Sequence, residues 1–117
     1  MVADIGEPFE ASHRIMRADL AGGPLYDLAT YPLMLATWLL GPPSDVVALT
    51  STAPADRSAS GVDGHTAAVM RTRSGAVSTI HATVLGATPT TATVVGSHGS
   101  LFPDSGCCSA GAGRRRR

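Results

Sequence analysis

The chain has 117 residues, 44% of them hydrophobic, so it is long enough to bury one modest core and too apolar to be disordered throughout. Its formal net charge is zero, but four of the nine basic residues are the arginines at 114–117, which leaves a mildly acidic body without a basic face for nucleic acid. The chain has no lysine, which excludes Schiff-base and P-loop chemistry. The longest apolar run, residues 33–40, is far shorter than the roughly 20 residues of a membrane span, and no signal-peptide pattern follows Met1. We therefore expect a cytoplasmic protein with neither membrane nor nucleic-acid partners.

The first part of the chain predicts one strand and a glycine turn. Residues 1–8 are interpreted as a lead-in, and the imperfect alternation of residues 9–17 predicts a strand. Residues 18–26 predict a loop. Its adjacent Gly22 and Gly23 give the backbone freedom for a tight turn with a close approach.

A strongly apolar helix is predicted over residues 27–40, followed by a glycine and two prolines that end it. Asp27 suits the N-cap, because a carboxylate there is favoured by the helix dipole. Pro32 leaves the start open. Either the helix begins at Asp27 and loses one hydrogen bond, or it begins near Thr30 and Pro32 falls in the first turn at little cost. A helix that is apolar all round predicts cover by a sheet and by another domain or loop, and we interpret Trp38 as core packing.

The rest of the chain has the pattern of strands separated by turns. Runs rich in valine and threonine predict strands at residues 45–52, 65–72, 76–85, 90–95 and 100–102. Arg73-Ser74-Gly75 joins two of these runs as a hairpin, with glycine where a positive φ is needed. Alternate residues of the run at 76–85 divide between two faces. The packed face takes Ile80, Ala82 and Val84, and the semi-polar face takes Val77, Thr79, His81 and Thr83.

These elements predict an α+β fold, with a mostly antiparallel, open-faced sheet covered on one side by a helix, in one domain at residues 1–103. Residues 104–117 have no periodicity and predict a disordered tail, in which Cys107 and Cys108 are free thiols. The terminal arginines are either a weak nucleic-acid or membrane tail or a stretch without function. The four histidines are scattered without ligand spacing, which predicts no metal site.

Asp27 and Tyr31, at the start of the apolar helix, are the best candidates for a functional site. They are four residues apart, so on one helix they stand on the same face, one turn apart. A plain helix cap for Asp27 and a core tyrosine for Tyr31 are the alternatives. Arg14 or Arg17 is a candidate to bind substrate oxygens near the glycine turn, and a solvated strand charge is the alternative for both.

The segment Gly22-Gly23-x-x-x-Asp27-x-x-x-Tyr31, followed by an apolar helix ending in Leu39-Leu40-Gly41, resembles the second domain of the Gfo/Idh/MocA oxidoreductases. The later segments agree in order. They are Gly6-Glu7-Pro8, Arg73-Ser74-Gly75-Ala76 and Val95-Gly96-Ser97-His98-Gly99-Ser100-Leu101. The resemblance covers residues 5–102. It implies a substrate-side α/β domain that closes on a Rossmann domain binding NAD or NADP, and whose open sheet face commonly packs against another subunit.

The resemblance also implies roles for the candidate residues. The family aspartate, matched by Asp27, binds substrate or supports a proton relay. The residue four positions on is usually histidine; here it is Tyr31, as in the branch that resembles glucose–fructose oxidoreductase and dihydrodiol or xylose dehydrogenases. Asp27 and Tyr31 are then catalytic and substrate-binding residues, with Arg17 a further substrate-binding candidate. The dinucleotide fingerprint Gly-x-Gly-x-x-Gly and the family's catalytic lysine are absent, so the resemblance implies that the cofactor is not held by this chain.

The expected function is therefore the substrate-side fragment of an NAD(P)-dependent oxidoreductase acting on a sugar, polyol or diol C–O carbon, inactive alone. The alternative is a sheet-mediated homo-oligomerisation or interaction module without catalysis, motivated by the half-polar strand at residues 77–83. A clean dimer that is lost when lysine replaces Thr79 and Thr83 would support that module. A third reading is a translated fragment that does not fold well.

Overall fold

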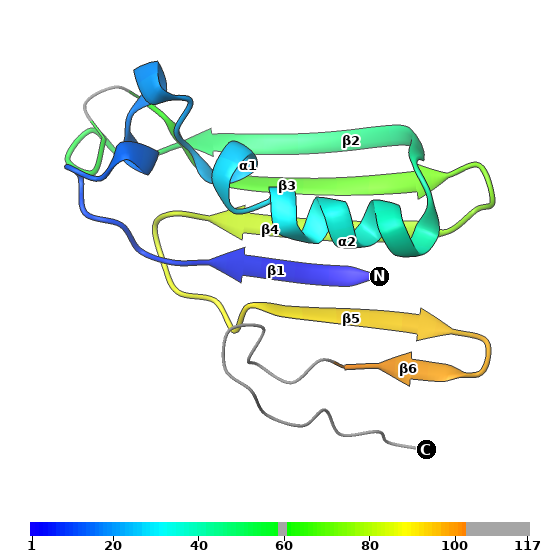
Figure 1. Ribbon diagram of the computed structural model, residues 1–117. Coiled ribbons are helices and arrows are strands. Elements are labelled where there is room, and N and C mark those ends of the chain that lie inside the picture. The colour runs from blue at the N-terminus through cyan, green and yellow to red at the C-terminus, as the bar shows by residue number, and fades with distance from the viewer. Residues whose placement is uncertain (59–60, 103–117) are drawn as a thin grey trace.

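The computed structural model describes residues 1–58 and 61–102, and it has the α+β fold expected from the sequence (Figure 1). Its elements in chain order are β1 (Val2–Gly6), the 3₁₀ helices η1 (Arg14–Met16) and η2 (Ala18–Leu20), α1 (Pro24–Asp27), α2 (Thr30–Leu40), β2 (Pro43–Thr52), β3 (Asp63–Thr72), β4 (Val77–Thr83), β5 (Thr91–Gly96) and β6 (Gly99–Leu101). The predicted tail at 104–117, with its two cysteines, lies outside the described residues.

The strands form a six-stranded sheet in the order β2-β3-β4-β1-β5-β6. Neighbouring strands are antiparallel except β1 and β4, which are parallel, with Ala3 opposite Ile80. Both α-helices of the described chain, α1 and α2, lie over the same face of the sheet (Figure 1). The predicted architecture is confirmed, although two consecutive helices provide the cover that one was expected to provide.

The first strand lies elsewhere than the sequence pattern predicted. Residues 2–6, interpreted as a lead-in, form β1 within the sheet, and residues 9–17, predicted as a strand, contain a turn and η1. Ile15 and Met16 are neighbours in sequence, yet they are 0% and 1% exposed. Two adjacent buried side chains do not suit a strand, whose side chains alternate between faces, but they suit a 3₁₀ turn packed into a core. His13 stabilises this turn, because its side chain accepts a hydrogen bond from the Ile15 N–H.

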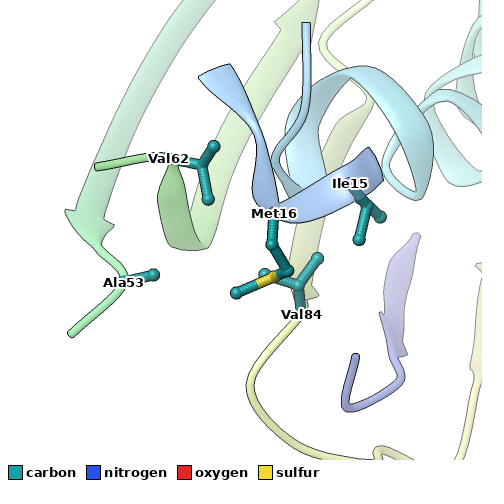
Figure 2. Close-up of a cluster of buried hydrophobic side chains, with 5 residues drawn as sticks. All are labelled: Ile15, Met16, Ala53, Val62 and Val84. Carbon is teal, nitrogen blue, oxygen red and sulfur yellow. The ribbon is translucent and has the colours of Figure 1, made fainter. Parts of the chain in front are cut away.

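Two apolar clusters hold the helical segments against the sheet. One cluster packs an alanine of the junction between α1 and α2 and an alanine of α2 on three residues of the sheet, and it consists of Ala29, Ala36, Met70, Ile80 and Ala82. The other packs η1 on residues that adjoin the end of β2, the start of β3 and the end of β4. It consists of Ile15, Met16, Ala53, Val62 and Val84 (Figure 2). The second cluster thus positions the segment that carries Arg14 and Arg17.

Burial along β4 confirms most of the predicted division between two faces. The three apolar residues assigned to the packed face are at most 2% exposed, and Val77 on the other face is 50% exposed. Thr83 departs from the prediction, since it is 3% exposed. Its hydroxyl donates to the Gly64 carbonyl oxygen at 3.1 Å and accepts the Leu85 N–H at 3.2 Å. A lysine at Thr83 would therefore break a buried contact, so this residue is unsuitable as a probe of the open face.

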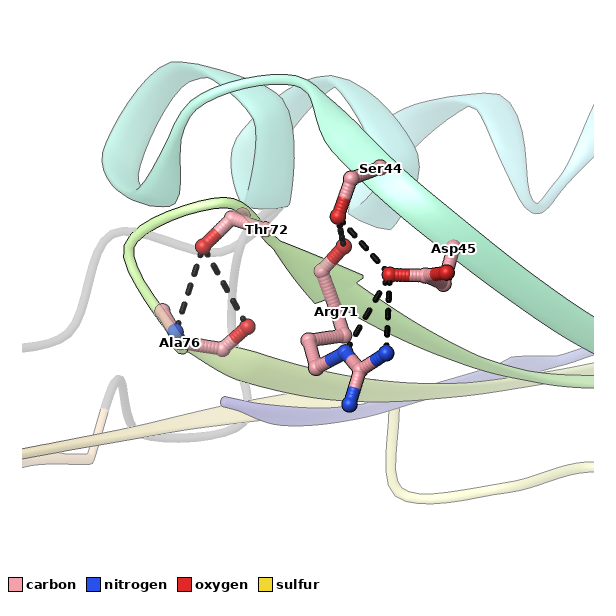
Figure 3. Close-up of polar contacts among 5 residues, drawn as sticks. All are labelled: Ser44, Asp45, Arg71, Thr72 and Ala76. Atoms are coloured by element: carbon pink, nitrogen blue, oxygen red, sulfur yellow. Dashed lines mark hydrogen bonds and ion pairs between the residues drawn. The ribbon is translucent and has the colours of Figure 1, made fainter.

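The predicted hairpin between β3 and β4 is confirmed. Gly75 has a φ of 88°, and the Thr72 hydroxyl accepts a backbone N–H from across the turn at 3.1 Å (Figure 3). Beside this turn, the Arg71 guanidinium donates to the Asp45 carboxylate at 3.1 Å, and the Ser44 hydroxyl donates to the Arg71 carbonyl (Figure 3). These polar contacts connect the start of β2 to the end of β3.

Candidate functional site

Asp27 and Tyr31 lie at the junction of two consecutive helices. α1 ends at Asp27 and α2 begins at Thr30, while Leu28 and Ala29 between them keep right-handed helical backbone angles. The Thr30 hydroxyl donates to the Asp27 carbonyl at 3.2 Å across this junction. The predicted N-cap role of Asp27 is therefore wrong, because an earlier short helix already ends there. The helical conformation predicted for residues 31–40 is confirmed, with Pro32 in the first turn.

The glycine turn before α1 has the close approach that its sequence predicts. A Cβ on Gly22 would lie 2.4 Å from the carbonyl oxygen of Ile15 and 2.6 Å from that of Arg17. Gly23 has a φ of 103°, and its N–H donates to the Ile15 carbonyl at 2.7 Å. Pro24 then occupies the first turn of α1, where its missing N–H costs nothing. The turn therefore holds η1 beside the two helices.

This packing brings Arg14 against Asp27. One guanidinium nitrogen of Arg14 lies 3.0 Å from both carboxylate oxygens of Asp27, a contact between residues 13 positions apart. The side chains of Arg14 and Asp27 are 59% and 28% exposed. An exposed pair of this kind contributes at most about 1 kcal/mol to folding, because solvent screens it. Asp27 is thus oriented by Arg14 and still open to a ligand.

Tyr31 and Arg17 face different surroundings. Tyr31 is 63% exposed, which excludes the alternative of a core tyrosine. Arg17 follows η1, and its guanidinium pairs with Asp19 at 2.6 Å. The hydrogen bond from Arg17, helped by its charge, lowers the pKa of Asp19 below the usual carboxyl value and raises the pKa of Arg17. Of the two arginines considered from the sequence, Arg14 is the one that the structure brings to Asp27.

The outer side of α2 is apolar and exposed. Pro32 and Ala36 are buried, and Ala36 packs on the sheet, whereas Met34 is 69% exposed and Trp38 is 81% exposed. The interpretation of Trp38 as core packing is wrong, because the side of the helix that carries it points away from the sheet. Tyr26 in α1 is likewise 69% exposed. Within the described chain, the cover predicted for this helix is therefore present on one side.

No three His, Cys, Asp or Glu side chains of residues 1–58 and 61–102 gather as a metal site. None of the helices in the same ranges combines the length and apolar character needed to cross a bilayer.

The structure thus defines an α+β domain with an open sheet face, and with a carboxylate and a phenol at a helix junction next to a glycine turn. Residues 2–102 match the GFO/IDH/MocA C-terminal domain, so the chain belongs to this family. Comparison with curated protein sequences gives no match.

Solved structures agree with this assignment. The aldose-aldose oxidoreductase from Caulobacter crescentus, complexed with glycerol, superposes with a TM-score of 0.81 at 25% identity, over 94% of this chain and 33% of that one. Levoglucosan dehydrogenase, in complex with NADH and levoglucosan, gives a TM-score of 0.74 at 25% identity, over 86% and 31%. The WlbA dehydrogenase from Bordetella pertussis, in complex with NADH and UDP-GlcNAcA, shares the fold with a TM-score of 0.73 at 22% identity, over 86% and 32%. The chain therefore spans about a third of the length of the proteins that it resembles.

Proposed function

We propose that this chain is the substrate-side part of a cytoplasmic NAD(P)-dependent oxidoreductase that acts on a C–O carbon of a sugar, polyol or diol. Its membership of the family over residues 2–102 supports this proposal. So do the levoglucosan and glycerol bound by two proteins that are 25% identical to it, since both ligands are polyhydroxy compounds. Tyr31, which replaces the usual histidine, favours the branch similar to dihydrodiol and xylose dehydrogenases.

The observation that carries the proposal is a partly exposed carboxylate, Asp27, and an exposed phenol, Tyr31, at the helix junction that follows the glycine turn. Asp27 accepts hydrogen bonds from substrate hydroxyls, and Arg14, which donates to both of its carboxylate oxygens, orients the carboxylate. Tyr31 donates a hydrogen bond or a proton to the reacting oxygen, which suits an exposed hydroxyl at a helix start. Arg17 remains a candidate for further substrate oxygens.

The residues of this chain do not fit a dinucleotide. The sequence has neither a Gly-x-Gly-x-x-Gly segment nor a lysine. The sheet contains a parallel pair only between β1 and β4 among the described strands, unlike the parallel sheet that binds dinucleotides at its carboxyl edge. In this proposal NAD or NADP belongs to another domain, and the isolated chain gives no turnover with either cofactor over a panel of sugars.

Substrate contact is tested by titrating the ¹⁵N-labelled chain with levoglucosan and with glycerol. We expect saturable shifts of the amide signals around Gly22, Asp27 and Tyr31. Asp27→Asn, which removes the charge and keeps the size, is expected to abolish these shifts. Shifts confined to the open sheet face would contradict the proposed site.

Catalytic roles are tested in a chimaera in which residues 2–102 of this chain replace the matched third of levoglucosan dehydrogenase. Tyr31→Phe is expected to lower kcat/KM by about 10²–10⁴-fold, the usual contribution of a general acid. The chain has two tyrosines, so Tyr26→Phe is the matched control: an exposed hydroxyl is removed from the neighbouring helix and activity stays unchanged. Equal losses in both variants would contradict a role for the Tyr31 hydroxyl.

The second candidate is a sheet-mediated interaction module, favoured by the open face of the sheet. Val47, Leu49 and Val69 on this face are 71%, 77% and 47% exposed. The rings of His65 and His81 stack beside them with centroids 5.9 Å apart. Because Thr83 is buried, Val69→Lys is the better probe: a dimer that this change dissociates supports the module, and a stable monomer contradicts it.

A further inference from the structure

Within the described chain, β2 forms a long, exposed edge of the sheet. β2 stands first in the sheet order and pairs with β3, and each of its ten residues is exposed. No other described strand borders its outer edge. An edge strand offers a row of unpaired N–H and C=O groups, so the partner that fits it is another extended strand.

The register of the hairpin shows which residues present these groups. The Thr72 N–H donates to the Ala76 carbonyl across the turn, and the Gly64 carbonyl accepts the Val84 N–H, so these residues point toward the β4 side and the alternate residues of β3 point toward β2. Val69 and Ala67 are among those that point toward β2, and they lie opposite Val47 and Leu49. The backbone groups of Val47 and Leu49 are therefore used in the sheet. The residues that present N–H and C=O to the free edge are Val46, Ala48 and Thr50.

Protection against strand pairing is confined to the ends of β2. Natural edges are blunted by charges, prolines and bulges. Pro43 and Asp45 stand at the start, and register shifts occur at Pro43/Asp45 and at Ser51/Thr52. The segment between them, residues 46–50, contains neither charge nor proline. α1 packs mainly on β3 and β4 and α2 on β1 and β4, so the helices leave β2 clear (Figure 1).

We propose that β2 pairs with β2 of a second copy of this chain, antiparallel, with Ala48 opposite Ala48 on a two-fold axis. In this register Ala48 exchanges both hydrogen bonds with its copy, and Val46 and Thr50 exchange theirs with each other, which gives about six backbone hydrogen bonds. The axis runs through the sheet from face to face. The helices of both copies then lie on one side, and the two open faces join on the other.

Side-chain pairing favours this register and a second copy as the partner. Val47 lies opposite Leu49 on the open face, so the most exposed apolar residues of β2 cover each other. Asp45 lies opposite Ser51, which keeps the two aspartates of the pair apart. Centring the pair on Val47 instead would place Asp45 against Leu49. A shift of the register by one residue, with Ala48 opposite Val47 of the second copy, would bring the helix face of one copy beside the open face of the other.

Light scattering under reducing conditions tests the proposal on the chain as it is. We expect twice the 11.9 kDa mass of the chain. Ala48→Pro removes an outward N–H, a position where an edge strand tolerates proline, and is expected to return a folded monomer. Val69→Lys is the matched control on β3, and it is expected to leave the dimer intact.

Amide exchange gives a second measurement that needs no variant. The amides of Val46, Ala48 and Thr50 are expected to exchange slowly at high concentration and rapidly on dilution, while those of Val47 and Leu49 stay protected at both. A monomeric chain at high concentration overturns the proposal. A dimer that survives Ala48→Pro but dissociates in Val69→Lys also overturns it, and assigns association to the open face. If Ala48→Pro does not fold, the exchange result decides.

Discussion

Gly22→Ala tests whether the glycine turn holds η1 in the position that brings Arg14 to Asp27. The added Cβ would lie 2.4 Å from the Ile15 carbonyl oxygen and 2.6 Å from that of Arg17. Overpacking usually costs about 1–3 kcal/mol, and here backbone atoms must move, so we expect about 3 kcal/mol. Since about 1 kcal/mol lowers the Tm of a domain of this size by about 4–8 °C, the Tm should fall by about 12–24 °C.

The measurement is thermal unfolding by far-UV circular dichroism, with Gly86→Ala as the control. A Cβ on Gly86 meets nothing within 4 Å, and its φ lies outside the left-handed region. Alanine there should leave the Tm unchanged or raise it slightly, because it reduces the entropy of the unfolded chain by about 0.4–1 kcal/mol. If Gly22→Ala unfolds at the same temperature as Gly86→Ala, the close approach does not constrain the turn, and the turn does not hold η1 beside the two helices.

Three further predictions concern exposed side chains. Arg14→Ala should lower the free energy of unfolding in urea by no more than about 1 kcal/mol, because its pair with Asp27 is exposed; a larger loss would show that the pair is structural. The pKa of Asp19, followed by NMR, should lie below the usual carboxyl value because Arg17 donates to it. The pair then stabilises the fold at neutral pH, and this contribution is lost as the pH falls through the lowered pKa. A pKa of Asp19 at the usual carboxyl value would contradict the pair. The single tryptophan, Trp38, should be quenched freely by acrylamide in the isolated chain, and Trp38→Ala should change the unfolding free energy by less than about 0.5 kcal/mol; a shielded indole would contradict its exposure.

The candidate site could be predicted from the sequence only in part. Gly22, Gly23 and Asp27 stand at spacings that indicate a turn before a helix, and the structure confirms the turn. The contact between Arg14 and Asp27 has no such signal, because it joins residues 13 positions apart through the packing of η1. α1 begins at Pro24, earlier than the helix that the sequence predicted. Asp27 therefore lies at the end of α1 instead of at the start of the long apolar helix.

Elements with a local cause were determined by the sequence alone. The hairpin between β3 and β4 follows from Gly75 at the turn, and α2 ends where Gly41 takes a φ of 89°. The alternation along β4 predicted its packed face because side chains of a strand alternate between two environments. Each of these features depends on interactions between residues that are close in the chain.

The tertiary structure decided whatever depends on distant partners. β1 is a strand because β4 and β5 provide backbone partners on both of its sides, although its five residues alone resemble a lead-in. Thr83 is buried because the Gly64 carbonyl meets its hydroxyl, and Trp38 is exposed because Ala36 takes the place against the sheet. Burial and long-range pairing depend on what the chain brings to a residue from elsewhere, which the residue's immediate neighbours in sequence do not specify.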